Sequence, residues 1–262
     1  MQVVYLKPHG FQQMREGKVS LSENRILIHK QKIALKEFVF DVPISGTVYG
    51  TLLNYKGAYS KIKKEMVNPP YNAEPKAPIL YIKPINTLTG HNAPIPIPDG
   101  IEHLEMGPSL GVVIGRRAYK VKKENVYHYI KGYIVANDVR IPHQSYYRPA
   151  LKDIARDGFC PVGPWIVDKI CVPNPNNLDV KVFINDELKM VNNTKNMVRD
   201  ISKLIEDVTE FMTLFEGDVL LTGVPENAPF ARTGDRVRIE IDQVGILENR
   251  ITPSNEVWRE VK

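Results

Sequence analysis

The sequence of 262 residues has no long apolar run and only two cysteines. Each of these two features excludes a class of protein. No run of about 18 apolar residues is present, as a transmembrane helix would need. The first residues do not have the cationic, then apolar, pattern of a secretory signal. Cys160 and Cys171 follow no metal-binding spacing, so we expect reduced thiols and no disulfide. We therefore expect a soluble, cytoplasmic protein without a membrane partner.

The chain also lacks a concentrated block of one charge sign. Its net charge is +5 and its isoelectric point is near 9.0, but Lys and Arg are spread along the sequence. Most of them are expected to be solvated surface residues, and recruitment of an anionic metabolite is the second interpretation. Without an arginine-rich block or a nucleic-acid-binding motif, we expect no nucleic-acid partner.

Short β-prone runs dominate what is present. Residues 1–45 contain three such runs and end at Pro43 and Ser45-Gly46, which predicts a small N-terminal β module. Residues 46–262 would form a second, larger domain. Its expected strands are 47–54, 79–84, 110–114, 133–135, 165–167, 178–184, 219–222 and 236–242. The fold class predicted is α+β and rich in strands.

Turns and helices are fewer. Asn185-Asp186 predicts a hairpin turn after the alternating run LDVKVFI, and residues 123–131 predict a short helix. Asn193 or Thr194 is expected to cap a longer helix. The apolar face of that helix would consist of Met197, Ile201, Leu204, Ile205, Val208 and Met212. The prolines of residues 94–98 alternate with apolar residues, which indicates an extended edge segment.

The stretch 101–138 has the pattern of a cation-binding scaffold with few ligands. Two apolar strands would end near Asp138, and side chains at 105, 107 and 109 would share one strand face. That face reads Glu105, Gly107, Ser109. The scaffold of a divalent-cation site is therefore present, but most of its carboxylates are absent.

Several motifs, in order, resemble the fumarylacetoacetate hydrolase family. Over residues 47–252 they are LNY, YIKPxNT, LGVVIG, GYxxANDV, RDGFCPVGPWIV, VFINDE, FMTLFEGDVLLTGVP and TGDRVRIEI. The resemblance implies a mixed β-roll like the C-terminal domain of that family. SYYRPALK and RDGFCPVG resemble in particular the N-terminal copy of its bifunctional decarboxylase/isomerases of 4-hydroxyphenylacetate (homoprotocatechuate) catabolism.

The resemblance also implies an Mg²⁺ or Mn²⁺ site, held by two glutamates of E-x-E-L-x-V-V-I-G and an aspartate of N-D. The glutamates fall on Gly107 and Ser109, and the aspartate falls on Asp138. One carboxylate with water is expected to hold Mg²⁺ poorly. Glu105 is the remaining candidate ligand, but it would lie roughly 7 Å from the lost position by strand rise.

Other family positions have changed as well. The lid pattern N-Y-x-D-H-A-x-E places its histidine on Ala58 and its glutamate on Lys61. The lysine before R-D-G falls on Ile154, and the threonine of G-T-P falls on Val224. The resemblance leaves Lys83, Asp157 and Thr222 as candidate catalytic residues. The candidates for binding an anionic substrate are Arg148, Lys152, Arg156 and Gly223, although the three basic residues also suit a solvated surface.

The expected function is that of a subunit in a decarboxylase/isomerase system acting on oxo di- or tricarboxylates. The reactions would be those of a 5-oxopent-3-ene-1,2,5-tricarboxylate decarboxylase and a 2-hydroxyhepta-2,4-diene-1,7-dioate isomerase. A homodimer, or a heteromer with a metal-complete homologue, is expected. Two alternatives stay open. One is an autonomous oxo-acid decarboxylase, tautomerase or acylpyruvate hydrolase with a rebuilt site. The other is a non-catalytic scaffold partner.

Overall fold

Two buried strands, β11 and β12, lie at the centre of the largest sheet. The computed structural model describes residues 1–143 and 150–257. All residues of β11 (Pro108–Ile114) are buried, as are those of β12 (Ile130–Asn137) apart from Lys131. The two strands pair antiparallel, with Pro108 opposite Asn137. Because both faces of the pair are covered, a nearly continuous apolar sequence suits this position.

The sheet around this pair has the order β4-β3-β2-β1-β13-β12-β11-β16-β6-β7, with β5 beside β1 and β8 beside β13. Its described pairs are antiparallel except β16 with β6 and β13 with β8. The further strands are β1 (Gln2–Pro8), β2 (Arg15–Ser20), β3 (Arg25–Ile28), β4 (Gln31–Ala34), β5 (Phe40–Asp41), β6 (Val48–Leu52), β7 (Ile79–Lys83), β8 (Leu88–Thr89), β13 (Cys160–Asp168) and β16 (Val219–Leu221).

The sheet curls into a roll, and the curl assembles the site. Four strand spacings separate β12 from β7, which would be about 19 Å in a flat sheet. The side-chain ammonium of Lys83, at the end of β7, nevertheless lies 3.0 Å from the carboxylate of Asp138, the first residue after β12. The ends of distant strands therefore meet.

A second sheet packs on the first. Its order is β15 (Glu187–Asn193), β14 (Asp179–Ile184), β18 (Arg236–Ile241), β19 (Gly245–Pro253) and β9 (Pro94–Ile97). β14 and β18 alternate strictly between half-buried and buried residues, so each turns one face to the core. The proline-rich strand β9 lies at the edge, as its sequence predicts. A short separate pair is formed by β10 (Leu104–Glu105) and β17 (Phe230–Ala231).

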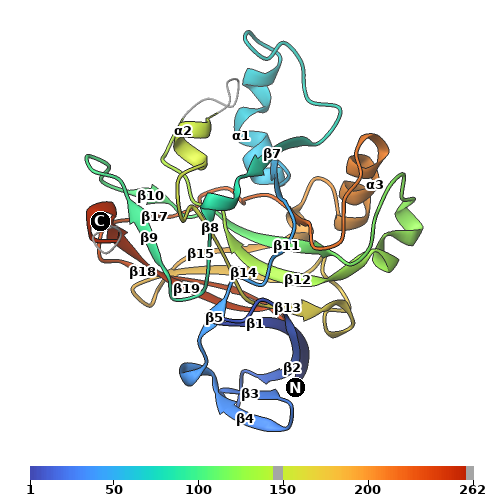
Figure 1. The fold of residues 1–262 in the computed structure, drawn as a ribbon. Helices are drawn as coiled ribbons and strands as arrows, with labels where there is room; N and C mark the ends of the chain where they lie inside the picture. Colours follow the sequence, from blue (N-terminus) through green and yellow to red (C-terminus); the bar gives the residue numbers. More distant parts are fainter. Residues whose placement is uncertain (144–149, 258–262) are drawn as a thin grey trace.

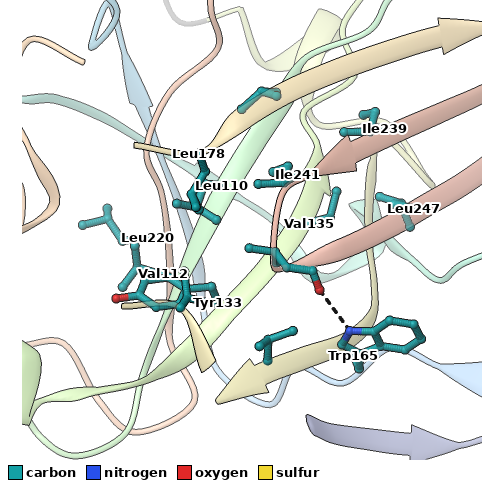
Figure 2. Close-up of a cluster of buried hydrophobic side chains, with 14 of the residues drawn as sticks. Leu110, Val112, Tyr133, Val135, Trp165, Leu178, Leu220, Ile239, Ile241 and Leu247 are labelled. Carbon is teal, nitrogen blue, oxygen red and sulfur yellow. Dashed lines mark hydrogen bonds between the residues drawn. The ribbon is translucent and has the colours of Figure 1, made fainter. Parts of the chain in front are cut away.

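Figure 2 shows the core between the two sheets. Leu110, Val112, Tyr133 and Val135 come from the central pair, and Ile239, Ile241 and Leu247 come from β18 and β19. Trp165 of β13 joins them and donates its indole N–H to the carbonyl oxygen of Val244, at 3.0 Å. Apolar packing therefore holds the two sheets together, with polar contacts from Trp165 and Gln2 to the turn between β18 and β19.

The helices lie outside the sheets. Figure 1 shows α1 (Lys56–Met66) and α2 (Leu151–Ile154) at the end of the molecule opposite β2–β4. The other helices are α3 (Ile201–Phe211) and α4 (Ser254–Val257), with 3₁₀ turns η1 (Leu35–Glu37), η2 (Ile85–Thr87), η3 (Lys123–His128), η4 (Lys169–Cys171) and η5 (Thr194–Asn196). Among the described residues, no helix is long and apolar enough to cross a bilayer.

Two helix predictions were wrong. The long helix does not start after Asn193 or Thr194, because the Asn193 side chain caps only the turn η5, accepting from the N–H of Lys195 at 2.9 Å. Helix α3 starts at Ile201, where the side chain of Asp200 accepts from the N–H of Lys203 at 2.7 Å. Residues 123–131 do not form one helix either, because the 3₁₀ turn η3 ends at His128 and β12 begins at Ile130.

Other predictions are confirmed. The described chain is α+β and rich in strands. Asn185 and Asp186 both have positive φ, 51° and 67°, as a two-residue hairpin turn between β14 and β15 requires. Both cysteines are free. Strand β1 pairs with β13 of the central sheet, and the division of the chain at residue 45 stays a prediction.

Candidate functional site

A cavity of about 140 Å³ lies where β6, β7 and β12 end beside α1. The β6 end, α1, β7, β10 and the segments after β12 and β16 all contribute to it. Its lining consists of Thr51, Leu52, Leu53, Ala58, Lys61, Ile62, Tyr81, Glu105, Asp138, Arg140, Val224, Pro225, Glu226 and Asn227. Charged groups of both signs face a space smaller than most ligand pockets, which measure roughly 300–1,000 Å³.

Asp138 is the carboxylate that the sequence predicted, and it is paired from within the protein. Its Oδ1 lies 3.0 Å from the ammonium of Lys83, and its Oδ2 accepts a hydrogen bond from the hydroxyl of Tyr81. Tyr81 and Lys83 are two residues apart on β7 and so point to the same face. The Lys83 side chain is 0% exposed and also donates to the carbonyl oxygen of Ile154, at 2.7 Å. The charge on Asp138 is therefore compensated without a bound ion.

Glu105 is paired as well. Its carboxylate forms an ion pair with the guanidinium of Arg140. The backbones of the two residues also exchange hydrogen bonds, from Glu105 N to Arg140 O at 2.9 Å and in return at 3.2 Å. This bridge holds the carboxylate against a fixed cation, so Glu105 is not free to turn toward Asp138.

The strand face predicted at 105, 107 and 109 does not exist as one surface. Strand β10 ends at Glu105 and β11 begins at Pro108, so the strand is interrupted between them. A Cβ placed on Gly107 would overlap the carbonyl oxygen of Asp138, and the Ser109 hydroxyl donates to Gly223 O at 3.0 Å. The backbone of Asp138 therefore closes position 107, and position 109 carries a hydroxyl that is already hydrogen-bonded.

These observations decide whether the residues present fit Mg²⁺ or Mn²⁺. In residues 1–143 and 150–257, no group of three or more His, Cys, Asp and Glu side chains could hold a metal ion. Asp138 and Glu105 are each neutralised by a cationic side chain. Divalent cations need several oxygen ligands that are free to coordinate. The residues do not fit the metal of the family.

Burial sets the proton-binding behaviour of the groups around Asp138. It raises the pKa of Tyr81 well above its ordinary value, and the charge of Asp138 raises it further. Tyr81 therefore stays protonated and donates its hydrogen bond at neutral pH. Burial also raises the pKa of the Cys160 thiol to about 12, against an opposing effect of Lys83. Cys160 is therefore not a thiolate nucleophile at neutral pH.

The structure brings only part of the predicted site together. Lys83 contacts Asp138, and the buried Thr222 hydroxyl has no hydrogen-bond partner among the described residues. Asp157 is exposed and accepts from the Asn86 amide at 2.7 Å, away from the cavity lining. The guanidinium of Arg156 donates to the carbonyl oxygen of Lys152 at 2.8 Å.

Among the anion-binding candidates, Lys152 and Arg156 do not line the cavity. Gly223 lies near it and accepts the hydrogen bond of Ser109 through its carbonyl oxygen. Arg148 lies outside the described residues. The roles assigned to all of these residues stay predictions.

Three cavity residues were missed in the sequence: Tyr81, Arg140 and Glu226. The alternation of ILYIK could have indicated Tyr81, because it places that residue on the same face as Lys83. Arg140 follows Asp138 by two residues and could have been noticed as a cation close to the strand end. No sequence signal distinguishes Glu226, which reaches the cavity from the segment after β16.

Comparison with known proteins gives consistent results. The family described as fumarylacetoacetate (FAA) hydrolase C-terminal matches residues 47–252. The 4-hydroxyphenylacetate degradation bifunctional isomerase/decarboxylase of Escherichia coli is 36% identical over 214 residues, which are 82% of this chain and 49% of the relative. Its counterpart from Salmonella dublin is 37% identical over 87% of this chain and 52% of the relative. The chain spans about half the length of these curated relatives.

Solved structures share the fold across nearly the whole chain. The 5-carboxymethyl-2-hydroxymuconate delta-isomerase from Mycobacterium smegmatis superimposes with a TM-score of 0.78 at 25% identity, over 97% of this chain and 99% of its own. A maleylpyruvate hydrolase from Sphingobium, in complex with manganese(II) and pyruvate, gives a TM-score of 0.78 at 24% identity, over 95% of this chain and 99% of its own.

Proposed function

The chain belongs to the fumarylacetoacetate hydrolase family, and on that basis we propose that it is one subunit of a decarboxylase/isomerase system in 4-hydroxyphenylacetate catabolism. The system would combine 5-oxopent-3-ene-1,2,5-tricarboxylate decarboxylase and 2-hydroxyhepta-2,4-diene-1,7-dioate isomerase activities. Two similar relatives are bifunctional enzymes, and the part of each that matches this chain is about half of its length. A chain that spans half of such an enzyme is consistent with a subunit whose partner supplies the other half.

The pairing of Asp138 with Lys83 is the observation that carries the proposal. Decarboxylation of an oxo acid needs a positive centre for the enolate that develops, and a divalent metal is a common one. Here the carboxylate at the family's aspartate position is already neutralised. The two glutamate positions hold Gly107, where a Cβ would overlap the backbone, and Ser109. We therefore assign the metal-dependent step to a metal-complete homologue that assembles with this chain.

The size of the cavity also supports a division of the reactions between this chain and a partner. At about 140 Å³, the cavity is smaller than most ligand pockets, which measure roughly 300–1,000 Å³. A small oxo acid, or the oxo-acid end of a longer substrate, is compatible with that volume. A whole tricarboxylate would have to extend out of it. In this proposal the chain is cytoplasmic, acts on small anionic oxo acids, and is either a homodimer or a heteromer.

Metal binding and reconstitution test the proposal. Titration of the purified chain with Mg²⁺ or Mn²⁺, with and without oxalate, is expected to give no saturable heat. Decarboxylation of the tricarboxylate is expected only after a metal-complete family chain is added. Micromolar metal binding that is lost in Asp138→Ala, together with turnover by the chain alone, would contradict the proposal.

A further inference from the structure

Lys61 differs from the other charged side chains that line the cavity, because it is exposed and is not part of an ion pair. The carboxylates of Glu105 and Asp138 each have a cationic partner. Within residues 1–143 and 150–257, the ammonium of Lys61 has only a neutral partner, the side-chain oxygen of Asn227, to which it donates at 2.8 Å. An ammonium has three N–H donors, so further donors of Lys61 are available to a ligand.

Glu226 also lines the cavity, but its carboxylate is engaged elsewhere. Its Oε1 accepts a hydrogen bond from the Asn192 side-chain amide at 3.1 Å, and its Oε2 is buried. The carboxyl group packs against the first turn of α1, where a Cβ on Gly57 would overlap it. That turn has no acidic residue and no side-chain cap of its own, and a helix N-terminus favours a nearby negative charge. The start of α1 therefore accounts for Glu226, and the charge of Lys61 stays available.

The helix places Lys61 on a side of the cavity that is distinct from its strand side. Ala58, Lys61 and Ile62 line the cavity together, because residues three and four positions apart share one face of a helix. The strand side contributes the carboxylates of Asp138 and Glu105. Carboxylates repel a second carboxylate and an ammonium attracts it, so an anionic ligand is oriented with its charged end toward α1.

We infer that Lys61 binds the carboxylate of a small 2-oxo acid in this cavity and sets the preference of the cavity for an anion over a neutral ligand of the same shape. The contact is a charge-assisted hydrogen bond from the ammonium to a carboxylate oxygen, which is stronger than one between neutral groups. Asn227 keeps the ammonium at the cavity through the hydrogen bond described above. Recognition of the anion then needs no metal ion.

This inference rests on the proposed function and deepens it, because it names the residue that recognises the proposed substrate class. It concerns binding alone and assigns no chemical step to Lys61. A chain that presents the oxo acid to a partner and a chain that acts on the oxo acid by itself both need such a residue.

Binding of pyruvate and of pyruvamide, its uncharged analogue, tests the inference. Each is titrated into the purified full chain in the presence of EDTA, and binding is followed by saturation-transfer proton NMR. Lys61→Met keeps the length of the side chain but removes its charge, and is expected to weaken pyruvate binding by about 10-fold while pyruvamide binding is unchanged. Lys61→Arg restores a cation and should restore the preference for pyruvate. Lys64→Met, at an exposed position of α1 outside the cavity lining, is the matched control and should bind like the wild type.

The outcomes separate this role from the proposed function. Equal pyruvate affinity in the wild type and in Lys61→Met overturns the role of Lys61 and leaves the reconstitution experiment unaffected. An equal loss for pyruvate and pyruvamide also overturns it, because Lys61 would then contribute shape and not charge. A loss of the same size in Lys64→Met overturns it as well, since any positive charge on α1 would then serve. Failure of the wild-type chain to bind pyruvate overturns the proposed substrate class together with this role.

Discussion

The central strand pair and the cavity meet at the end of β12, at Asp138, yet they handle burial in opposite ways. In β11 and β12 nearly all side chains are apolar and buried, and they pack against the second sheet (Figure 2). One residue after β12, Asp138 begins a region where carboxylates, ammonium and guanidinium groups are buried or half-buried together. The strand pair is stabilised by excluding water from apolar surface, and the cavity by pairing charges.

The difference shows which part of such a site can be lost without losing the fold. In this chain β11 and β12 pair with Pro108 opposite Asn137, although residues 107 and 109 carry no carboxylate. In the cavity, in contrast, Asp138 and Glu105 are each paired with a cation, Lys83 and Arg140 respectively. Lys83 and Arg140 therefore supply positive charge next to the carboxylates of the cavity.

The largest expected effect comes from removing one of those cations. Lys83→Met leaves the buried carboxylate of Asp138 without its cation, and we expect a loss of about 3 to 5 kcal/mol in the free energy of unfolding. Chemical denaturation at neutral pH measures it. Adding Asp138→Asn to the same chain should recover much of the loss, because the uncompensated charge disappears.

Lys64→Met, at an exposed position of α1, is the control and should change stability by less than about 0.5 kcal/mol. If Lys83→Met cost no more than the surface control, the cavity would not depend on charge pairing, and the comparison with the strand pair would fail.

Low pH provides a second test of the comparison. His91 is partly buried, and burial disfavours its protonated, charged form. Burial lowers the pKa of His91 to about 4, and its Nδ1 accepts a hydrogen bond from the N–H of Glu248 at 3.1 Å. The unfolded chain takes up this proton near pH 6.5, but the folded chain does so only near pH 4. Stability contributed by neutral His91 is therefore complete above about pH 6.5 and falls as the pH drops toward 4.

The size of this acid effect is on the order of 3.5 kcal/mol, because the pKa falls from 6.5 to about 4 and each unit of pKa corresponds to about 1.4 kcal/mol. Chemical denaturation at a series of pH values measures it. His91→Asn keeps an acceptor for the Glu248 N–H and should flatten the profile between pH 4 and 6.5. His128→Asn, at an exposed position, should leave the profile as it is.

The sequence predicted the strand pair well because local pattern determines it. The run LGVVIG and the alternating run LDVKVFI correspond to β11 and β14, and Asn185-Asp186 forms the expected turn. The start of α3 was missed because Asn193 and Asp200 are both good capping residues, and only the fold decides that the first caps a 3₁₀ turn. The break between β10 and β11 was missed because a continuous strand was assumed.

The cavity could be predicted only in part, because its contacts join distant segments. Asp138 was found from its position at a strand end. Its contact with Lys83 depends on the curl of the sheet, and the approach of Glu226 to Gly57 depends on how the segment after β16 crosses α1. Local sequence patterns predict neither the curl of the sheet nor this crossing. The resemblance to the family identified Gly107 and Ser109 at the glutamate positions, but it could not show which cations pair with Asp138 and Glu105.

The boundary between the two regions can be tested at Gly107. Gly107→Ala places a Cβ against the carbonyl oxygen of Asp138, so the backbone must shift, and we expect a loss of about 1 to 3 kcal/mol in chemical denaturation. Gly90→Ala is the matched control, because the nearest atom to its added Cβ would be 3.8 Å away. An unchanged stability in Gly107→Ala would mean that the backbone there yields easily, and that a ligand side chain could be restored.

The smallest effect is expected in the apolar region, at the hydrogen bond from Trp165 to Val244 that Figure 2 shows as a dashed line. Trp165→Phe keeps an aromatic ring on β13 but removes the N–H that the Val244 carbonyl accepts. The loss should be about 1 to 2 kcal/mol, since one buried acceptor is left without a partner. Tyr119→Phe, which removes an exposed hydroxyl, is the control. Because neither residue of this hydrogen bond is charged, its loss should be the same at low and high salt, and a salt-dependent loss would show that charges also act between the sheets.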